Sequence, residues 1–283
     1  MSPRSARALA LVLATATLAG CGASTRSDDI TLTVTQDFGT KTLVSDASEA
    51  VPEAGGLARI LRPYANTRGG HSLFVNGILA GEPAGKLEVH GGDRVWLDQH
   101  AAGVAREIPA VVGAFPQPFV GGIGGKRLPV RVECDDPRAG ACAAVADKLV
   151  GLGVVAGRSI ISRSAADETV RILVAPWSRL RGREFEADSL DKGPRASGVY
   201  ARFDGSARRL LVLDASGRVA RTLGAGTGLV AATAANERKP VWFITGTDQA
   251  GVDAAARALD ESVLSERFAL AISNDLPVAV PQP

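Results

Sequence analysis

The chain of 283 residues has few of the side chains that build metal and redox sites: three cysteines, three histidines and one methionine. It has no G-x-S-x-G, H-E-x-x-H, C-x-x-C or P-loop motif, which removes the familiar templates of hydrolases, zinc proteases, thiol oxidoreductases and nucleotide-binding proteins. After the first twenty residues, no segment approaches eighteen consecutive apolar residues, so no membrane-spanning helix is expected there. These absences favour a binding or structural protein over an enzyme.

Neither sign of charge dominates the chain. It has 32 Lys and Arg against 30 Asp and Glu, and the first twenty residues hold two arginines, Arg4 and Arg7, and no acid. Residues 21–283 therefore carry 32 − 2 = 30 basic and 30 acidic side chains. Because nucleic-acid binding depends largely on neutralising phosphates, this balance argues against a nucleic-acid partner. An apolar content of 46% is typical of a globular protein with a substantial core.

The N-terminus has the pattern of an export signal. Arg4 and Arg7 precede an apolar run at 9–18, and the run ends in Leu18-Ala19-Gly20-Cys21. This ending resembles the lipobox of bacterial lipoproteins, which implies that residues 1–20 are a signal peptide and that Cys21 is lipidated. The protein is then expected on the extracytoplasmic face of the cell membrane, held in the bilayer by acyl chains, with residues 21–28 as a flexible tether. The alternative is a cleaved secretory signal followed by an unmodified cysteine.

Cys134 and Cys142 remain as a pair once Cys21 carries lipid. In an oxidising compartment, an even number of cysteines indicates a disulfide, and two buried thiols are the alternative. Seven intervening residues match no zinc-binding spacing, so no metal is expected.

Residues 29–101 have the pattern of a small sheet wrapped on one helix. Alternating β-branched and apolar residues predict strands at 30–35 and 41–44, and a short helix is expected within 48–61. Two strands flank Asn76-Gly77, and a last strand runs over 94–98. This order predicts a β-grasp (ubiquitin-like) domain and, with the second half, an α+β fold. Residues 102–127 are rich in Pro and Gly but also apolar, and are expected to be a connector packed between the two halves.

Three short motifs carry a family resemblance: TVTQDFG at 33–39, Phe74-Val75-Asn76-Gly77, and Gly92-Asp93-Arg94-Val95-Trp96. With them, residues 29–100 resemble the transcobalamin-like C-terminal domain family. The related domain of the animal vitamin B12 carriers covers one face of cobalamin. The resemblance implies a ligand surface, which we expect to comprise five residues: His71, Phe74, Asn76, Trp96 and Asp98.

Two features set limits on this resemblance. His71 stands where relatives usually have an aromatic residue, so the ligand expected here is either different from cobalamin or absent. Asn76-Gly77 is also the strongest short signal for a hairpin turn, and Gly92-Asp93 fits a tight turn into the last strand.

Residues 128–275 are predicted to form a larger α/β sandwich domain with a mixed sheet, followed by a tail at 276–283. The expected strands are 128–134, 169–175, 198–203, 209–214, 218–223, 240–245 and 268–272. Helices are expected at 139–151, around a break at Gly182, at 227–236 and, as the longest helix, at 248–264 with Asp248 as its N-cap.

Three other groups of residues have a functional and a structural interpretation. His71, His90 and His100 have the chemistry of metal ligands, but their spacing matches no metal motif, and solvated strand ends explain them as well. The helix start at 245–248 is a natural anion site, yet Asp248 already occupies it as a cap. The segment 177–183, WSRLRGR, is either an interaction patch for an acidic polymer or lipid head group, or a solvated basic face.

The sequence therefore predicts a lipid-anchored lipoprotein that binds a small molecule or a cell-wall component, with no catalytic residue and no cofactor beyond the covalent lipid. A cobalamin-like ligand is implied by the family resemblance alone. The alternative is a structural envelope protein without a small ligand. A third hypothesis, an envelope enzyme in the second half, requires a deep pocket lined by converging polar groups.

Overall fold

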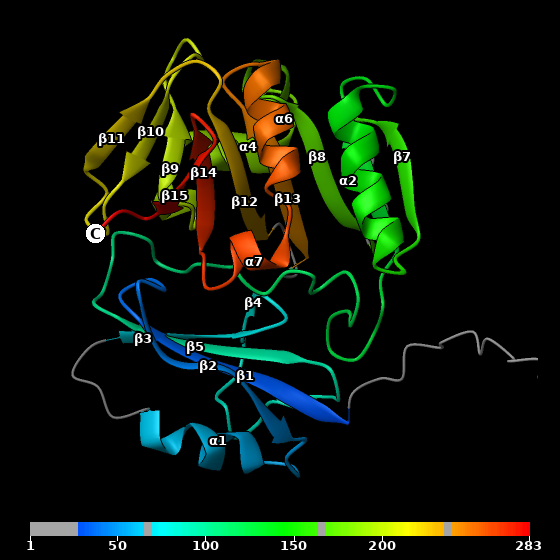
Figure 1. Cartoon of the computed structure of the whole chain (residues 1–283). Helices are drawn as coiled ribbons and strands as arrows, with labels where there is room; N and C mark the ends of the chain where they lie inside the picture. Colours follow the sequence, from blue (N-terminus) through cyan, green and yellow to red (C-terminus); the bar gives the residue numbers. More distant parts are fainter. Residues whose placement is uncertain (1–27, 65–69, 163–167, 235–238) are drawn as a thin grey trace, which may run out of the picture.

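The computed structural model describes residues 28–64, 70–162, 168–234 and 239–283. Figure 1 shows a smaller part with the N-terminal strands below a larger part with the second half of the chain. The predicted signal peptide and residues 21–27 of the predicted tether, including Cys21, lie outside the described residues. The fold is mixed α/β, with two mixed sheets and one antiparallel sheet.

The first part is a five-stranded sheet with the strand order β2-β1-β5-β3-β4. Its strands are β1 (Asp29–Gln36), β2 (Lys41–Ala50), β3 (Gly70–Val75), β4 (Ile78–Leu79) and β5 (Arg94–His100). β1 pairs parallel with β5, and the other neighbours pair antiparallel. The helix α1 (Gly56–Leu61) and the short 3-10 helix η1 (Arg62–Tyr64) follow β2. Leu57 and Leu61 of α1 share a core with alternate residues of β1 and β5.

The helix expected within 48–61 is shorter than predicted. β2 continues as far as Ala50, and α1 begins only at Gly56, after Pro52 and the left-handed Gly55. Proline and a left-handed glycine both oppose helix in this segment, which explains the late start.

The second part is built on a seven-stranded sheet with the order β15-β14-β12-β13-β8-β6-β7. β6 (Val130–Cys134), β7 (Ala156–Ile160), β8 (Val170–Pro176) and β13 (Pro240–Gly246) are parallel to their neighbours in this group. β12 (Gly228–Ala234), β14 (Ala269–Ser273) and β15 (Leu276–Val280) extend the sheet in the antiparallel sense.

Helices cover the two faces of this sheet unequally. α2 (Gly140–Gly151) and α6 (Gln249–Arg257) lie side by side on one face, and the short α7 (Glu261–Leu264) follows α6 (Figure 1). The other face is covered by α3 (Trp177–Leu180), α4 (Phe185–Asp191), α5 (Pro194–Ser197) and the antiparallel strands β9 (Ala201–Phe203), β10 (Leu210–Leu213) and β11 (Val219–Leu223). Alternation in β8 separates the two cores, because Ile172 and Val174 pack with α2 and α6 while Leu173 and Ala175 pack with α3 and α4.

The connector joins the two sheets through backbone contacts. Ala110 forms an antiparallel bridge with Ile78, and the amides of Leu79 and Val111 donate to the carbonyls of Pro109 and Gly77 at 3.0 and 2.9 Å. Further on, the amide of Val112 donates to the carbonyl of Phe268 at 3.2 Å. The connector therefore lies between the two sheets, as its apolar composition indicates.

The helix predicted at 227–236 is wrong, because residues 228–234 form strand β12. Both faces of this strand are covered: Val230 and Ala232 pack toward α2 and α6, and Leu229 and Ala231 pack toward the other core. A strand buried on both faces does not alternate between apolar and polar residues, and this one is rich in alanine, a strong helix former.

Three more predictions of the second half need correction. The single helix expected at 248–264 is divided into α6 and α7, because Asp260 caps a new helix, and α2 is longer than either. The expected tail at 276–283 contains β15, so the strand at 268–272 is not the edge of the sheet. β7, the strand at the opposite edge, was not predicted.

Candidate functional site

The carboxyl ends of β6 and β8 define the best candidate site. The two strands are parallel neighbours, and the chain leaves β6 for α2 on one face of the sheet but leaves β8 for α3 on the other face. In open α/β sheets, such a point, where successive connections diverge to opposite faces, leaves a crevice at the strand ends in which ligands commonly bind.

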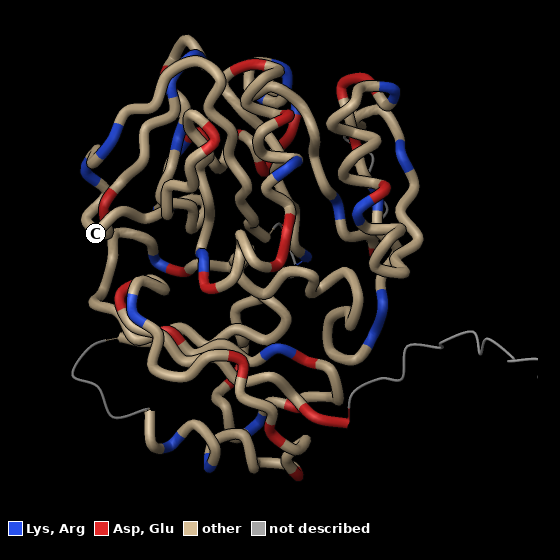
Figure 2. The backbone as a smooth tube through the Cα atoms, viewed as in Figure 1, with Lys and Arg blue, Asp and Glu red and all other residues tan. Residues whose placement is uncertain are grey.

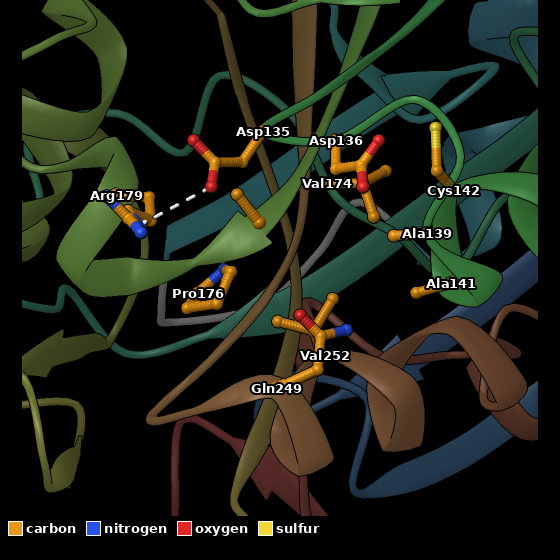
Figure 3. Close-up of a pocket in the computed structure, with 11 residues that line it drawn as sticks. Asp135, Asp136, Ala139, Ala141, Cys142, Val174, Pro176, Arg179, Gln249 and Val252 are labelled. Carbon is orange, nitrogen blue, oxygen red and sulfur yellow. Dashed lines mark ion pairs between the residues drawn. The ribbon is translucent and has the colours of Figure 1, made fainter.

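A cavity of about 180 Å³ occupies this position. Figure 3 shows its lining side chains, which come from the end of β6, the start of α2, the end of β8, α3 and α6. The lining residues are Asp135, Asp136, Ala139, Ala141, Cys142, Val174, Ala175, Pro176, Arg179, Gln249 and Val252. The floor is thus apolar, and two carboxylates, one guanidinium and one amide provide the polar groups.

Charges of both signs meet at this cavity. Asp135 is held by two arginines, with Arg179 Nε 3.5 Å from Oδ2 and Arg183 Nη1 3.6 Å from Oδ1. The carboxylate of Asp136 accepts a hydrogen bond from the amide of Arg138 at 2.9 Å, and its Oδ1 lies 3.8 Å from Nε of the same arginine. Both aspartates are therefore paired with arginines, but Asp136 is 60% exposed and Arg138 is 95% exposed, so Asp136 is the more accessible of the two.

The disulfide between Cys134 and Cys142 confirms the predicted cysteine pair. It joins the last residue of β6 to the first turn of α2, and Cα atoms eight residues apart in sequence lie 6.1 Å from each other. The loop that carries both aspartates is thus closed at its two ends by one covalent bond. Such a bond limits the positions open to Asp135 and Asp136.

The two helices at the cavity begin differently. Asp248 caps α6, accepting from the amide of Gly251 at 2.9 Å, and its second oxygen accepts from the amide of Gly226 at 2.8 Å. The predicted cap is therefore confirmed, and the carboxylate fills the place that an anion would take at this helix. α2 has Ala139 in the N-cap position and no side-chain cap.

A buried charge cluster supports the same strand ends from the other face. Arg171 of β8 donates to Glu133 of β6 and to Glu184 just before α4, with Nη2 at 2.8 Å from each carboxylate. Burial by itself lowers the pKa of Arg171, but hydrogen bonds to the two glutamates outweigh it and raise that pKa above its ordinary value. Arg171 therefore stays protonated and ties β6, β8 and α4 together.

Two of the residues expected to contact a ligand, Phe74 and Trp96, lie in the core instead. Their rings are 5.6 Å apart, and both pack against Phe268, at 5.7 and 5.1 Å between centroids. Trp96 donates from Nε1 to the hydroxyl of Thr35 at 2.8 Å. It borders a cleft of only about 10 Å³. These aromatic side chains fill the seam between the two sheets.

Asn76 is also a structural residue in this fold. It is 1% exposed, and its amide group donates to Asp93 at 2.7 Å and to the carbonyl of Gly122 at 2.9 Å, while its oxygen accepts from the amide of Arg94. Its φ of 53° and the 77° of Gly77 fit the tight turn that the Asn-Gly pair indicates. The structural interpretation of this pair is therefore confirmed.

Asp98 and His71 lie on the paired strands β5 and β3 but differ in burial. Asp98 is fully buried and accepts from the Thr35 hydroxyl and from the amides of Phe38 and Gly39. Burial raises the pKa of its carboxyl above 3.8, although these hydrogen bonds and the nearby His100 act in the opposite direction. His71 is exposed on β3. Four of the five expected residues are thus buried, and His71 alone among the five is exposed.

The three histidines do not converge either. The ring of His100 stacks on Phe38 at 4.3 Å, and His90 Nδ1 lies 3.6 Å from Asp93. Over the residues that the structure describes, no three His, Cys, Asp or Glu side chains are grouped so that they could hold a metal ion.

Of the two interpretations of the segment 177–183, the interaction patch is wrong for Trp177, its aromatic residue. Trp177 is fully buried and stacks on Phe203 at 4.8 Å, and its Nε1 donates to Asp191. Arg181 forms an ion pair with Asp191 at 2.6 Å. Arg179 and Arg183 are paired with Asp135, so the three arginines of this segment form ion pairs within the protein, beside the cavity.

A second, more open cleft of about 500 Å³ lies beside the seam. Asp46, Phe115, Lys148, Leu152, Asp260, Glu261, Ser262 and Ser265 line it. Most of its charges are already paired, since Lys148 contacts Asp260 and Arg94 contacts Glu261. The side chains that line it come from β2, the connector, the end of α2 and the region of α7, and not from a point where strand connections diverge.

Sequence reasoning did not single out Asp135, Asp136 or Gln249. The available signal was the pair of acids directly after a predicted buried strand, since polar residues at that position meet at the carboxyl edge of a parallel sheet.

Within the described parts of the chain, no helix is long and apolar enough to cross a membrane. The sequence matches no protein-family model and no curated protein.

Proposed function

We propose that this protein is an extracytoplasmic binding protein, lipid-anchored at Cys21, which holds a small polar ligand in the cavity at the ends of β6 and β8. The observation that carries this proposal is the position of the cavity, where the connections from two parallel strands diverge to opposite faces. The lipobox-like sequence supports the location of the protein, and the disulfide is compatible with an oxidising compartment.

The cavity restricts the class of ligand. Its volume of about 180 Å³ is below the ~300–1,000 Å³ of pockets for drug-sized molecules. Asp136 offers an exposed carboxylate for a cationic or hydroxyl group, and Gln249, whose Nε2 already donates to Asp253 at 2.9 Å, offers its carbonyl oxygen as an acceptor. The best candidates are therefore compounds of amino-acid or amino-sugar size.

We further propose that the N-terminal sheet is a β-grasp domain. The strand order β2-β1-β5-β3-β4, the parallel central pair and the single packed helix support this assignment. It also agrees with the resemblance to the transcobalamin-like family. A cobalamin ligand gains no support from the positions of Phe74, Trp96 and Asp98, because all three side chains are buried.

The ligand proposal is tested by thermal unfolding of a soluble form, residues 22–283. The probes are L- and D-alanine, glutamate, lysine and glucosamine, each at millimolar concentration. We expect at least one of them to raise the unfolding temperature, since a ligand that binds only the folded state stabilises it. Asp136→Asn should abolish this shift, and Arg59→Ala, an exposed substitution on α1, should retain it. If no probe shifts the transition, the proposed ligand class is wrong.

The anchor is tested separately in cells. The full-length chain should take up radiolabelled palmitate and fractionate with membranes, and Cys21→Ala should lose both properties. An unlabelled wild-type protein in the culture medium would instead support a cleaved secretory signal.

A structural envelope protein is the second candidate, favoured by the aromatic side chains that fill the seam. Phe268 contacts Phe38, Phe74, Trp96 and His100, so the two parts of the chain are joined by a packed core and not by a ligand cleft. In this case, the protein should co-purify with an envelope complex after cross-linking, and Asp136→Asn should leave that complex intact.

A further inference from the structure

One segment of the second half carries an excess of positive charge. Residues 192–223, called the β9–β11 lobe here, run from the end of α4 through α5 and strands β9 to β11, and contain seven basic and two acidic residues. Residues 21–283 as a whole are balanced, so this lobe is a local source of positive charge in a neutral chain. Figure 2 shows the blue segments on these strands at the upper left of the molecule.

The two acids of the lobe are already engaged. Asp204 pairs with Arg209 at 3.0 Å, and Asp214 pairs with Arg218 at 3.1 Å, each inside its own hairpin turn. Hydrogen bonds from Ser206 and Ser216, followed by those from the arginines, lower the pKa of both carboxyls to about 2. These four residues therefore cancel one another's charge at neutral pH.

Five cations of the lobe have no acidic partner within the described structure: Lys192, Arg195, Arg202, Arg208 and Arg221. All five are exposed. Their positive charges are thus available to a molecule in solution.

The fold brings these cations onto neighbouring elements. Arg202 lies in one cross-strand row with Leu211 and Thr222, whereas Arg221 lies in the next row, opposite Val212, so the side chains of Arg202 and Arg221 leave the sheet on opposite faces. The side chain of Arg202 also lies next to Gly193, which stands between Lys192 and Arg195. Cations distributed in this way over α5 and both faces of the small sheet fit a long chain of anionic groups better than one compact anion.

We propose that the β9–β11 lobe binds an anionic polymer with repeating phosphate or carboxylate groups. Guanidinium groups suit such ligands, because they bind both kinds of anion through two parallel hydrogen bonds. The choice of a polymer over the bilayer rests on the proposed anchor at Cys21, and on the place of the lobe.

The lobe lies at the opposite end of the molecule from the start of β1 (Figure 1). Asp28 is seven positions after Cys21, so the two residues are at most about 25 Å apart even in a fully extended chain. An anchored molecule therefore keeps β1 near the membrane and presents the lobe to the surrounding envelope.

The test measures binding of residues 22–283 to immobilised polyphosphate and poly-L-glutamate at 50–500 mM NaCl. The lobe variant is R195Q/R202Q/R221Q, and its control is R59Q/R62Q/K86Q, which removes the same three charges from exposed positions of the N-terminal part. We expect the lobe variant to bind at least one polymer tenfold more weakly at low salt, with a salt dependence reduced by about 0.7 per lost contact. The control should remain within twofold of wild type.

Three outcomes would overturn the proposal. The first is no binding to either polymer, and the second is an equal loss in both variants, which would indicate a general charge effect. The third is binding only to vesicles of phosphatidylglycerol and phosphatidylcholine, which would assign the lobe to the bilayer. Circular dichroism and unfolding temperature verify that both variants fold. Asp136→Asn should bind the polymer normally, so failure of the cavity proposal is distinguishable from failure of this one.

Discussion

Arg171 donates two parallel hydrogen bonds to the carboxylate of Glu133 inside the molecule, from Nε to Oε1 at 3.0 Å and from Nη2 to Oε2 at 2.8 Å. The arginine side chain is 7% exposed and that of Glu133 is fully buried. Glu184, also buried, takes a third hydrogen bond from the same guanidinium. One buried cation thus neutralises carboxylates from two separate segments of the chain.

Arg171→Met should therefore destabilise the protein by about 3–5 kcal/mol, because it leaves buried carboxylates without a counter-ion. The measurement is urea unfolding of residues 22–283 at pH 7. Arg131→Met is the matched control, since Arg131 lies on β6, is 34% exposed and is 3.9 Å from Glu133. Its loss should cost less than ~1 kcal/mol. Equal costs for the two variants would contradict the role assigned to Arg171.

The disulfide should stabilise both the fold and the cavity. For a closed loop of this length, the chain-entropy estimate is about 2.5 kcal/mol, lost on reduction or in a Cys134→Ala/Cys142→Ala variant. Because the bond closes the loop that carries Asp135 and Asp136, the variant should also weaken binding of any compound that shifts the unfolding temperature of the wild-type protein. A destabilised variant with unchanged affinity would show that the loop holds its shape without the bond.

Gly39 and Gly92 form a natural pair for testing the seam. Both have a positive φ, 77° and 86°, but a Cβ on Gly39 would lie 1.9 Å from the carbonyl oxygen of Glu266, whereas a Cβ on Gly92 meets nothing within 4 Å. Each alanine substitution should cost about 1–2 kcal/mol for the left-handed backbone. Gly39→Ala should cost a further ~1–3 kcal/mol, because the β1–β2 turn must move away from the second part.

Urea unfolding of the two variants gives the comparison. If Gly39→Ala is no more destabilising than Gly92→Ala, the turn does not pack on Glu266 in solution.

Asp98 should give an unusual pH dependence. Burial raises its pKa in the folded state, so folding favours the protonated carboxyl. The contribution of Asp98 to stability is then greatest below the unfolded pKa near 3.9 and falls as the pH rises toward the folded value. Relative to Asp98→Asn, the wild-type protein should lose stability as the pH rises above about 4. Chemical denaturation from pH 3 to 8 measures the difference in free energy of unfolding between the wild-type protein and Asp98→Asn. If this difference grows in favour of the wild-type protein as the pH rises, the hydrogen bonds to Asp98 outweigh its burial.

Much of the fold could be predicted from local patterns. The alternation of threonines with Ile30, Leu32 and Val34 identified β1, and Asn76-Gly77 identified a turn, because each pattern depends on neighbours in the sequence. Asp248 identified the start of α6 for the same reason. The cysteine pair was also predictable, since only two cysteines remained after Cys21.

The errors occurred where tertiary packing overrides local preference. β12 is an alanine-rich segment that pairs with β13 and β14, and its sequence has no strand alternation because both faces are covered. The hairpin before β15 had a readable signal in Asn274-Asp275, whose φ angles of 52° and 56° fit a two-residue turn. The tail predicted at 276–283 is wrong because this turn returns the chain to the sheet, where β15 pairs with β14.

The candidate site was harder to predict, since it depends on which strands become neighbours. Asp135 and Arg179 are 44 positions apart, and they meet because β6 and β8 pair in the sheet. Phe74 and Trp96 illustrate the opposite case, in which aromatic residues expected to contact a ligand form the packing surface for Phe268.

The position of β1 has a mechanical consequence for an anchored protein. The strand that follows the tether is paired on both sides, antiparallel with β2 and parallel with β5. A pulling force on the proposed tether that acts along β1 loads two rows of hydrogen bonds in shear, instead of separating one edge strand bond by bond. An envelope protein built in this way can sustain tension at its attachment point while the rest of the chain stays folded.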